Sequence, residues 1–370
     1  MRVGTPQALV LALCLSVTTG CSVMRRPESD SQSWRWMQDA STQASTQQTY
    51  SVGRGTAAHR GSFASDARPS EFDFSHPRVD DYVARFQTDL RGFFSQALSR
   101  SGRYVPRMST ILQKEGVPQE LAYLPLIESG FRTQAVSRAG AVGPWQFIRQ
   151  TGQRYGLRID QYVDERRDPV KSTHAAARYL KDLYEMFGNW HLSLAAYNTG
   201  ERNISRILGK GVADDFWQMS DRGYLYQETE NYVPQFLAAL QIAEEPEAYG
   251  FEPPEEQPLH YDLVNITKPL TLATVAQLSG TTTDTIKELN PALHRGVVPP
   301  QGYAVRLPKG TKEAFQVALA NLPPTYFARA SHTTKVRARR GRTLRSPHRA
   351  HRSRAVAAVK HVRGRPTVVA

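Results

Sequence analysis

One carboxylate is placed where it could act as a general acid. Glu128 stands near the end of the apolar segment 121–131, and helical spacing would put it on the same face as leucines and a phenylalanine. No other acidic residue occurs between Glu128 and Asp160. Apolar neighbours favour the neutral carboxyl group and raise its pKa, which suits protonation of a leaving oxygen near neutral pH. The alternative is a structural glutamate that accepts hydrogen bonds from the backbone of the next loop.

A segment punctuated by glycine follows at 135–147 and carries groups that suit a polar, ring-shaped ligand. Gly140 and Gly143 would let the backbone come close to such a ligand. Trp145 offers a flat apolar surface of the kind on which sugar rings stack. Gln146 supplies both a hydrogen-bond donor and an acceptor. The alternative is an ordinary loop with one tryptophan in the core.

A phenol and a carboxamide stand side by side near the end of a helical run at 190–198. Tyr197 and Asn198 precede Gly200, and both side chains could contact polar groups of a ligand. A tyrosine on an apolar helix normally packs in the core with its hydroxyl at the rim, and Asn198 could simply cap the helix. Both interpretations stay open from these residues alone.

The elements that would position these residues are all helical between residues 76 and 245. Apolar residues recur there at i, i+4 and i+7, and no alternating strand pattern competes. A fourth helix is expected to be capped by Ser172 or Thr173 and to end at Gly188. The other expected helices cover 79–97, 103–114, 119–129, 190–198 and 231–243.

The pattern changes after a Pro- and Glu-rich linker at 246–257. Strands are expected at 259–266 and 303–307, with short helices at 271–278 and 283–289 between them. The unit at 258–310 is thus a small α+β (βααβ) module, followed by a short helix and turn at 311–330. The predicted fold class is mainly α, with this module and with disordered segments at both ends of the chain.

The motifs between residues 128 and 233 resemble, in order, those of the lytic transglycosylase domain of the goose-type lysozyme superfamily. They are Glu128-Ser129, Ala-Val-Ser with Gly-Ala-Val-Gly-Pro-Trp-Gln, Thr-Gly, Ala-Ala-Tyr-Asn and Glu-Thr-Glu-Asn-Tyr-Val. The resemblance covers about 79–243 and implies a lysozyme-like helical domain with Glu128 as catalytic acid/base. It also implies a saccharide cleft, whose expected residues are Ser129, Gln146, Tyr197, Asn198 and Tyr232. Pro144, where the family usually has leucine, can adjust the backbone beside the cleft without removing chemistry.

The unit at 258–310 is similar to LysM carbohydrate-binding modules. The shared features are Thr-Leu with Val-Ala at 271–276, Ile-Lys-Glu-Leu-Asn-Pro at 286–291 and the end at 302–308. The opening Gly-Asp-Thr-Leu of that family is replaced here by Lys-Pro-Leu-Thr-Leu at 268–272. Two interpretations therefore stay open for this module, which are a glycan-binding unit and a structural appendage.

The resemblance implies chemistry with one carboxylate, whereas glycosidases usually employ two. Glu128 would protonate the β-1,4 glycosidic oxygen between N-acetylmuramic acid and N-acetylglucosamine of peptidoglycan glycan strands. It would then take the proton of the muramoyl C6 hydroxyl, which closes onto C1 as a 1,6-anhydro end. Glu228 is expected to have a structural role or to support the cleft, and no metal or cofactor is implied. Two rival functions stay open: a muramidase, and a non-catalytic cell-wall-binding lipoprotein.

Residues 1–21 are typical of an export signal with a lipobox-like end. Arg2 precedes an apolar run at 8–15 that is too short to span a bilayer, and small residues precede Cys21. Thr18 replaces the usual leucine, so a plain secretory signal and an uncleaved anchor are the alternatives. We expect a lipid on Cys21 as membrane anchor and a disordered tether at 22–75. The expected location is the periplasmic face of the outer membrane, with a soluble periplasmic protein as the alternative.

The C-terminal tail at 331–370 differs sharply in charge from the rest of the chain. The formal net charge is +13, yet this tail holds 12 of the 47 basic residues and none of the 34 acidic ones. A tail of this composition cannot build a core, and the remaining chain is nearly neutral. We expect the tail to bind anionic wall or lipid groups. Nucleic acid is not expected as a partner, because the tail lacks interleaved aromatic residues for base stacking.

Composition excludes several classes of protein. With 40% hydrophobic and 22% charged residues, the chain has the make-up of a globular protein and not of a multi-span membrane protein. The two cysteines, Cys14 and Cys21, both lie at the N-terminus. A cysteine nucleophile, a cysteine-based zinc site and a disulfide framework are therefore excluded from the domains.

Overall fold

The computed structural model describes residues 72–327, and their contacts form two compact units. Within the described residues, the first unit comprises 72–96, 137–139 and 180–252, and the second comprises 97–136, 140–179 and 253–327. The expectations for the export signal, for Cys21, for the basic tail and for nearly all of the tether lie outside the described residues.

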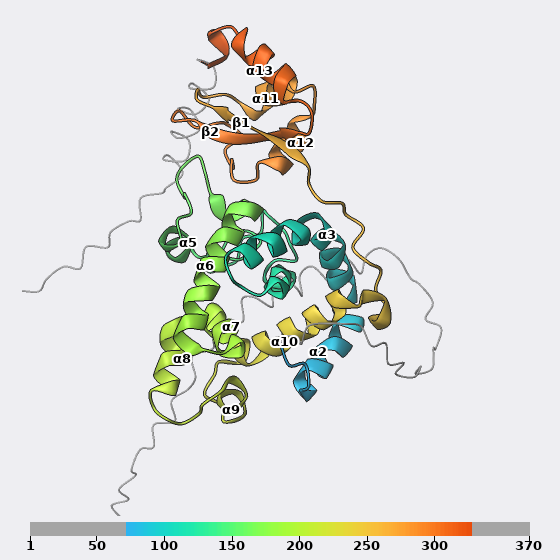
Figure 1. Ribbon diagram of the computed structural model, residues 1–370, viewed down its shortest axis with the longest axis vertical. Helices are drawn as coiled ribbons and strands as arrows, with labels where there is room; N and C mark the ends of the chain where they lie inside the picture. The colour runs from blue at the N-terminus through green and yellow to red at the C-terminus, as the bar shows by residue number, and fades with distance from the viewer. Residues whose placement is uncertain (1–71, 328–370) are drawn as a thin grey trace, which may run out of the picture. The chain divides into compact units, whose positions relative to one another are not determined.

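The first unit is helical and is built around the long helix α10. Its elements are α2 (Pro77–Gln87), the start of α3 (Arg91–Lys114), the end of α6 (Pro169–Phe187), α7 (Trp190–Thr199), α8 (Glu201–Leu208), α9 (Phe216–Asp221), α10 (Gln227–Glu244) and the 3₁₀ turn η3 (Pro246–Tyr249). Helix α10 packs against α2 and α7 (Figure 1). Phe236 of α10 is fully buried and meets Phe72 edge-on, with ring centroids 5.6 Å apart. The core of this unit therefore follows the buried side chains of α10.

The second unit combines further helices with the small module. Its helical part contains the rest of α3, η1 (Gln119–Tyr123), α4 (Pro125–Glu128), α5 (Arg149–Arg154), η2 (Glu165–Arg167) and the start of α6. Tyr104 of α3 stacks on Phe131, with ring centroids 6.1 Å apart and an interplanar angle of 9°. Trp145 is fully buried, and its indole N–H donates to the Thr173 hydroxyl at 2.9 Å. Trp145 is thus a core residue, and its interpretation as a sugar-stacking surface is wrong.

The module has the predicted βααβ order. It consists of β1 (Tyr261–Ile266), α11 (Leu272–Leu278), α12 (Thr283–Leu289) and β2 (Tyr303–Pro308), followed by α13 (Lys312–Ala320) (Figure 1). The two strands are antiparallel, with Tyr261 opposite Pro308 and Ile266 opposite Tyr303. Thr271 and Thr282 cap the two helices through their side chains. The fold class predicted from the sequence, mainly α with a small α+β module, is confirmed.

The boundaries expected for the first two helices are wrong. The chain leaves α2 at Thr88, and α3 then runs for 24 residues through Gly102 and Pro106. Gly102 lies inside α3, at the point where another segment comes close. A Cβ atom there would lie 2.4 Å from the carbonyl oxygen of Glu256. Glycine is therefore needed at this position for packing.

Two further local expectations are also corrected. The helix expected at 119–129 is split into η1 and α4, because Pro125 has no N–H to continue the first piece. Helix α6 begins at Pro169, four residues before Thr173. Its first N–H groups, those of Val170 and Lys171, donate to the Asp168 carboxylate at 3.0 Å each. Asp168 is thus the cap, and proline at the first helical position suits it.

The segment expected as a linker at 246–257 begins with ordered structure. Its first residues form η3, and Phe251 is buried against Phe94 with ring centroids 5.2 Å apart. This part of the segment therefore contributes to the core of the first unit.

Candidate active site

Glu128 is the last residue of the short helix α4. Leu126 and Ile127 before it are buried, whereas Glu128 is partly exposed. The chain then turns sharply, with positive φ at Gly130 (58°) and at Phe131 (59°). Leu121 and Leu124, two of its expected apolar neighbours on the chain, are fully buried. The carboxyl group therefore sits where a helix leaves the core, and its expected raised pKa stays a prediction.

Ser129 links the end of α4 to the glycine-rich loop at 140–147. Its side chain is fully buried, and the hydroxyl donates to the carbonyl oxygen of Pro144 at 2.9 Å. A buried hydroxyl with this bond holds two segments together. The residue beside Glu128 therefore fixes the position of the loop that carries Gln146.

The loop at 140–147 depends on an unusual backbone. Gly143 has φ of 85°, and a Cβ atom there would lie 1.8 Å from the carbonyl oxygen of Arg166. Gln146 has φ of 47°, which is uncommon for a residue other than glycine and is found at functional sites. Its Nε2 donates to the Gly143 carbonyl oxygen at 2.8 Å, and the side chain is partly exposed. The amide of Gln146 is thus held in one orientation at the surface.

Arg166 holds this loop from the side of η2. Its Nη1 donates to the carbonyl oxygens of Gly140 and Phe147, both at 3.0 Å. The guanidinium also forms a two-bond pair with Asp164, at 2.9 and 2.8 Å. Burial would raise the pKa of the Asp164 carboxyl, but the hydrogen bonds and charge of Arg166 hold that pKa below its usual value. Arg166 is therefore a buried, paired cation that fixes both ends of the loop.

The remaining predicted site residues lie in the first unit, on α7 and α10. Asn198 accepts a hydrogen bond from the Thr229 hydroxyl at 2.8 Å, and its Nδ2 donates to Glu228 Oε1 at 3.4 Å. Asn198 therefore does not cap α7, which ends at Thr199 and has Gly200 as its C-cap. Tyr197 is partly exposed. Tyr232 is 4% exposed, so only a small part of it is accessible at the surface.

The structure thus places the six predicted residues in two groups. Glu128, Ser129 and Gln146 lie together in the second unit, whereas Tyr197, Asn198 and Tyr232 lie in the first. Sequence reasoning missed Arg166, which binds the two ends of the Gln146 loop, and Thr229, which donates to Asn198. For Arg166 a signal existed in the charged run 164–168, directly before a proline that starts a helix.

Neither a metal site nor a membrane span is found in the part of the chain that the structure describes. Between residues 72 and 327, no group of three or more His, Cys, Asp or Glu residues is arranged to hold a metal ion. Over the same range, every helix is too short or too polar to cross a bilayer.

Comparison with known proteins gives two family matches and several relatives. Residues 109–219 match the transglycosylase SLT domain, and residues 260–323 match the family described as lytic transglycosylase MltD, LysM-like domain. The chain is 32% identical to membrane-bound lytic murein transglycosylase D of Escherichia coli K12 over 260 residues, which cover 68% of this chain and 57% of that protein. It is 29% identical to membrane-bound lytic murein transglycosylase F 2 of Alkalilimnicola ehrlichii over 191 residues, which cover 48% of this chain and 39% of that protein.

Among solved structures, the 70 kDa soluble lytic transglycosylase SLT70 of Escherichia coli is similar with a TM-score of 0.36 and 22% identity, over 47% of this chain and 30% of that one. The chain spans little more than half the length of its Escherichia coli transglycosylase D relative. The first match contains Glu128, and the second contains the βααβ module. The chain therefore contains a transglycosylase SLT domain, followed by a domain of the MltD LysM-like family.

Proposed function

We propose that this chain is a peptidoglycan lytic transglycosylase that acts in cell-wall turnover and remodelling. It would cleave the β-1,4 bond between N-acetylmuramic acid and N-acetylglucosamine without water and leave 1,6-anhydromuramoyl ends. The observation that carries this proposal is the placement of Glu128 within the matched SLT domain. Glu128 ends α4 beside Ser129, whose buried hydroxyl is bonded to the loop of Gln146.

Glu128 would perform both proton transfers. In its neutral form it donates a proton to the glycosidic oxygen while the C1–O bond breaks and positive charge develops at C1. The resulting carboxylate then accepts the proton of the C6 hydroxyl, and O6 forms the new bond to C1. Glu128 regains its proton in this second step, so the cycle closes with no co-reactant. A partly exposed carboxyl group at the edge of an apolar core suits both forms.

The other predicted site residues divide by exposure. Gln146, Tyr197 and Asn198 are partly exposed, and we assign them to direct contacts with hydroxyl and acetamido groups of the glycan strand. Ser129 and Tyr232 are buried, so we assign them to supporting these contacts from within the domain. Glu228 keeps the amide of Asn198 in place.

The decisive experiment is Glu128→Gln, assayed on purified glycan strands with mass spectrometry of the products. We expect turnover to fall by a factor of about 10² to 10⁴, the usual contribution of a general acid or base. Glu120→Gln, the same chemical change on η1, is the matched control and should keep wild-type turnover. Equal turnover by Glu128→Gln and wild type would overturn the catalytic assignment. Wild-type products that carry an added water would identify a muramidase instead, and the absence of any product would favour a non-catalytic wall-binding protein.

We also propose that Cys21 is lipidated and holds the chain at the periplasmic face of the outer membrane. Support comes from the lipobox-like residues before Cys21 and from the membrane-bound designation of the Escherichia coli relative. The part of the expected tether before Phe72 would let the domains reach the wall, because Phe72 itself is buried in the first unit. Cys21→Ser should move the protein from the membrane fraction to the soluble fraction, and an unchanged distribution would contradict the lipid anchor.

A further inference from the structure

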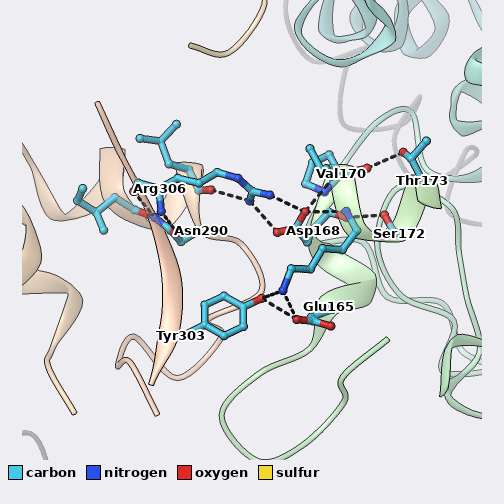
Figure 2. Close-up of polar contacts among 12 residues, drawn as sticks. Glu165, Asp168, Val170, Ser172, Thr173, Asn290, Tyr303 and Arg306 are labelled. Carbon is cyan, nitrogen blue, oxygen red and sulfur yellow. Dashed lines mark hydrogen bonds and ion pairs between the residues drawn. The ribbon is translucent and has the colours of Figure 1, made fainter. Parts of the chain in front are cut away.

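The LysM-like module, residues 258–320, is bound to the SLT domain by buried polar contacts. Arg306 of β2 donates to Asp168 through Nη1 at 2.6 Å and through Nη2 at 2.8 Å (Figure 2). The two side chains are only 11% and 2% exposed. Nη1 also donates to the carbonyl oxygen of Leu289 within the module, at 3.2 Å. A two-bond pair of this kind is strongly directional, so it specifies one orientation of the two partners.

A second polar cluster lies beside the first. The hydroxyl of Tyr303 donates to Glu165 Oε1 at 3.0 Å (Figure 2). Lys171 contacts both groups. Burial and the neighbouring carboxylates of Glu165 and Asp168 raise the pKa of the Tyr303 phenol, so it stays a hydrogen-bond donor. Both clusters therefore join a strand of the module to the residues around η2.

Apolar and backbone contacts also join the module to the residues around η2. Val163 is fully buried within the hydrophobic cluster that forms the core of the module. The backbone N–H of Asp164 donates to the Ala292 carbonyl oxygen at 2.9 Å. Arg295 Nε donates to the carbonyl oxygen of Gln161 at 3.0 Å. The module thus packs on segment 161–171, and Val163 of that segment is part of the module's core.

That same segment holds the loop of Gln146. Arg166 binds the carbonyl oxygens of Gly140 and Phe147, and its own carbonyl oxygen packs where only a glycine fits at 143. Two residues further on, Asp168 receives the bonds from Arg306. A short piece of backbone, 166–168, therefore connects the module to the loop beside Glu128.

We propose that the LysM-like module positions the active-site loop, with Arg306 as the positioning residue that sets the place of segment 164–168. This inference rests on the proposed function for its kinetic consequence. A buried ion pair contributes little net stability when compared with apolar side chains, and fixing one arrangement is its best-attested use. The module therefore belongs to the catalytic machinery even where the substrate needs no anchoring to the wall.

The test uses the full chain and the double variant Arg306→Leu with Asp168→Asn. The asparagine still caps α6, and no buried charge is left without a partner. On soluble glycan strands we expect kcat to fall about tenfold or more, with KM within a factor of about three. Amide hydrogen exchange at Val142 and Gly143, whose N–H groups bond within and beside the loop, should become at least about tenfold faster.

Lys309→Ala is the matched control, because it removes an exposed ion pair with Asp262 within the module. It should leave kcat and the exchange of both amides at wild-type values. Arg306→Lys, which keeps the charge but loses the two-bond geometry, should fall between wild type and the double variant.

Two outcomes would overturn the positioning role. One is a double variant that folds with wild-type kcat and wild-type exchange in the loop. The other is a fall in kcat without faster exchange at Val142 and Gly143. If the wild type forms no anhydro product, the proposed function fails. The exchange measurement then still decides whether the module holds the loop.

Discussion

At the scale of single residues, Gly140 and Gly143 belong to one loop but require glycine for different reasons. Both have positive φ, of 79° and 85°. Nothing lies within 4 Å of a Cβ atom built at Gly140, whereas one built at Gly143 collides with the backbone of Arg166. The left-handed conformation alone therefore constrains Gly140, and both conformation and space constrain Gly143.

Gly140→Ala and Gly143→Ala form a matched pair that separates these effects. Gly140→Ala should lower the free energy of unfolding by about 1–2 kcal/mol, the cost of a left-handed residue with a Cβ atom. Gly143→Ala should lower it by more than about 3 kcal/mol and should also reduce turnover, because the Gln146 loop must move away from Arg166. Urea unfolding and the glycan-strand assay measure both. Equal losses for the two variants would refute the close approach at Gly143.

His191, on α7, predicts a dependence of stability on pH. Burial lowers the pKa of its imidazole, Asp73 and Asp215 oppose this shift, and His76 adds to it. Its Nε2 is buried without a hydrogen-bond partner among the described residues. Below about pH 6.5 the imidazole of His191 binds a proton more readily in the unfolded chain than in the folded one. The free energy of unfolding must therefore decrease as the pH is lowered.

His191→Phe should make the decline in stability between about pH 6.5 and 5 shallower, by up to one proton per unfolding event. His76 and His294 also have lowered pKa values and should preserve part of the slope. Unfolding midpoints measured across this range provide the comparison. A variant with the wild-type slope would show that His191 titrates alike in the folded and unfolded chain.

At the scale of elements, the start of α6 combines a helix cap with the contact to the module. Asp168 accepts bonds from Val170 and Lys171 at the helix start and from Arg306 of β2. Thr282 caps α12 by the same local geometry but is exposed and has no charged partner. Asp168 therefore holds both a helix start and a contact to the module, whereas Thr282 holds a helix start.

Asp168→Ala should destabilise the protein by about 3–5 kcal/mol, because it leaves the buried Arg306 without its partner. Thr282→Ala should cost about 1 kcal/mol, the usual value of a lost cap. Chemical denaturation of both variants measures this difference. A loss of only about 1 kcal/mol for Asp168→Ala would contradict the idea that the variant leaves Arg306 buried without a partner.

At the scale of the whole molecule, buried contacts join the module to the SLT domain that precedes it. Val163 shares the hydrophobic cluster of the module, and Asp168 and Glu165 find their partners on β2. The module and the SLT domain are therefore expected to be one stability unit.

Two truncations test this expectation. A chain that ends at Gln257 should have a lower unfolding midpoint and should lose activity on soluble strands, because Val163 and Asp168 become uncovered. A chain that ends at Ala330 should keep both properties. It should bind sacculi more weakly only at low salt, because attraction of basic residues to anionic surfaces is screened by ions. Full activity after truncation at Gln257 would contradict a shared unit, and unchanged sacculus binding after truncation at Ala330 would contradict a binding role for the tail.

Sequence alone determined the features that depend on near neighbours. Helix α7, the helices capped by Thr271 and Thr282 and the two strands of the module all follow from local periodicity and capping. Glu128 was also found in this way, because a lone carboxylate in an apolar run and the motifs after it are visible along the chain.

Tertiary structure alone decided the features that depend on residues far apart along the chain. Position 102 of α3 needs glycine because Glu256 packs there, more than 150 positions away. The pair Arg306–Asp168 spans 138 positions, and local spacing carries no information about such a contact. Local rules identified the candidate catalytic carboxylate, whereas the fold determined which segments hold its neighbouring loop, because buried charges take whichever partner the packing brings to them.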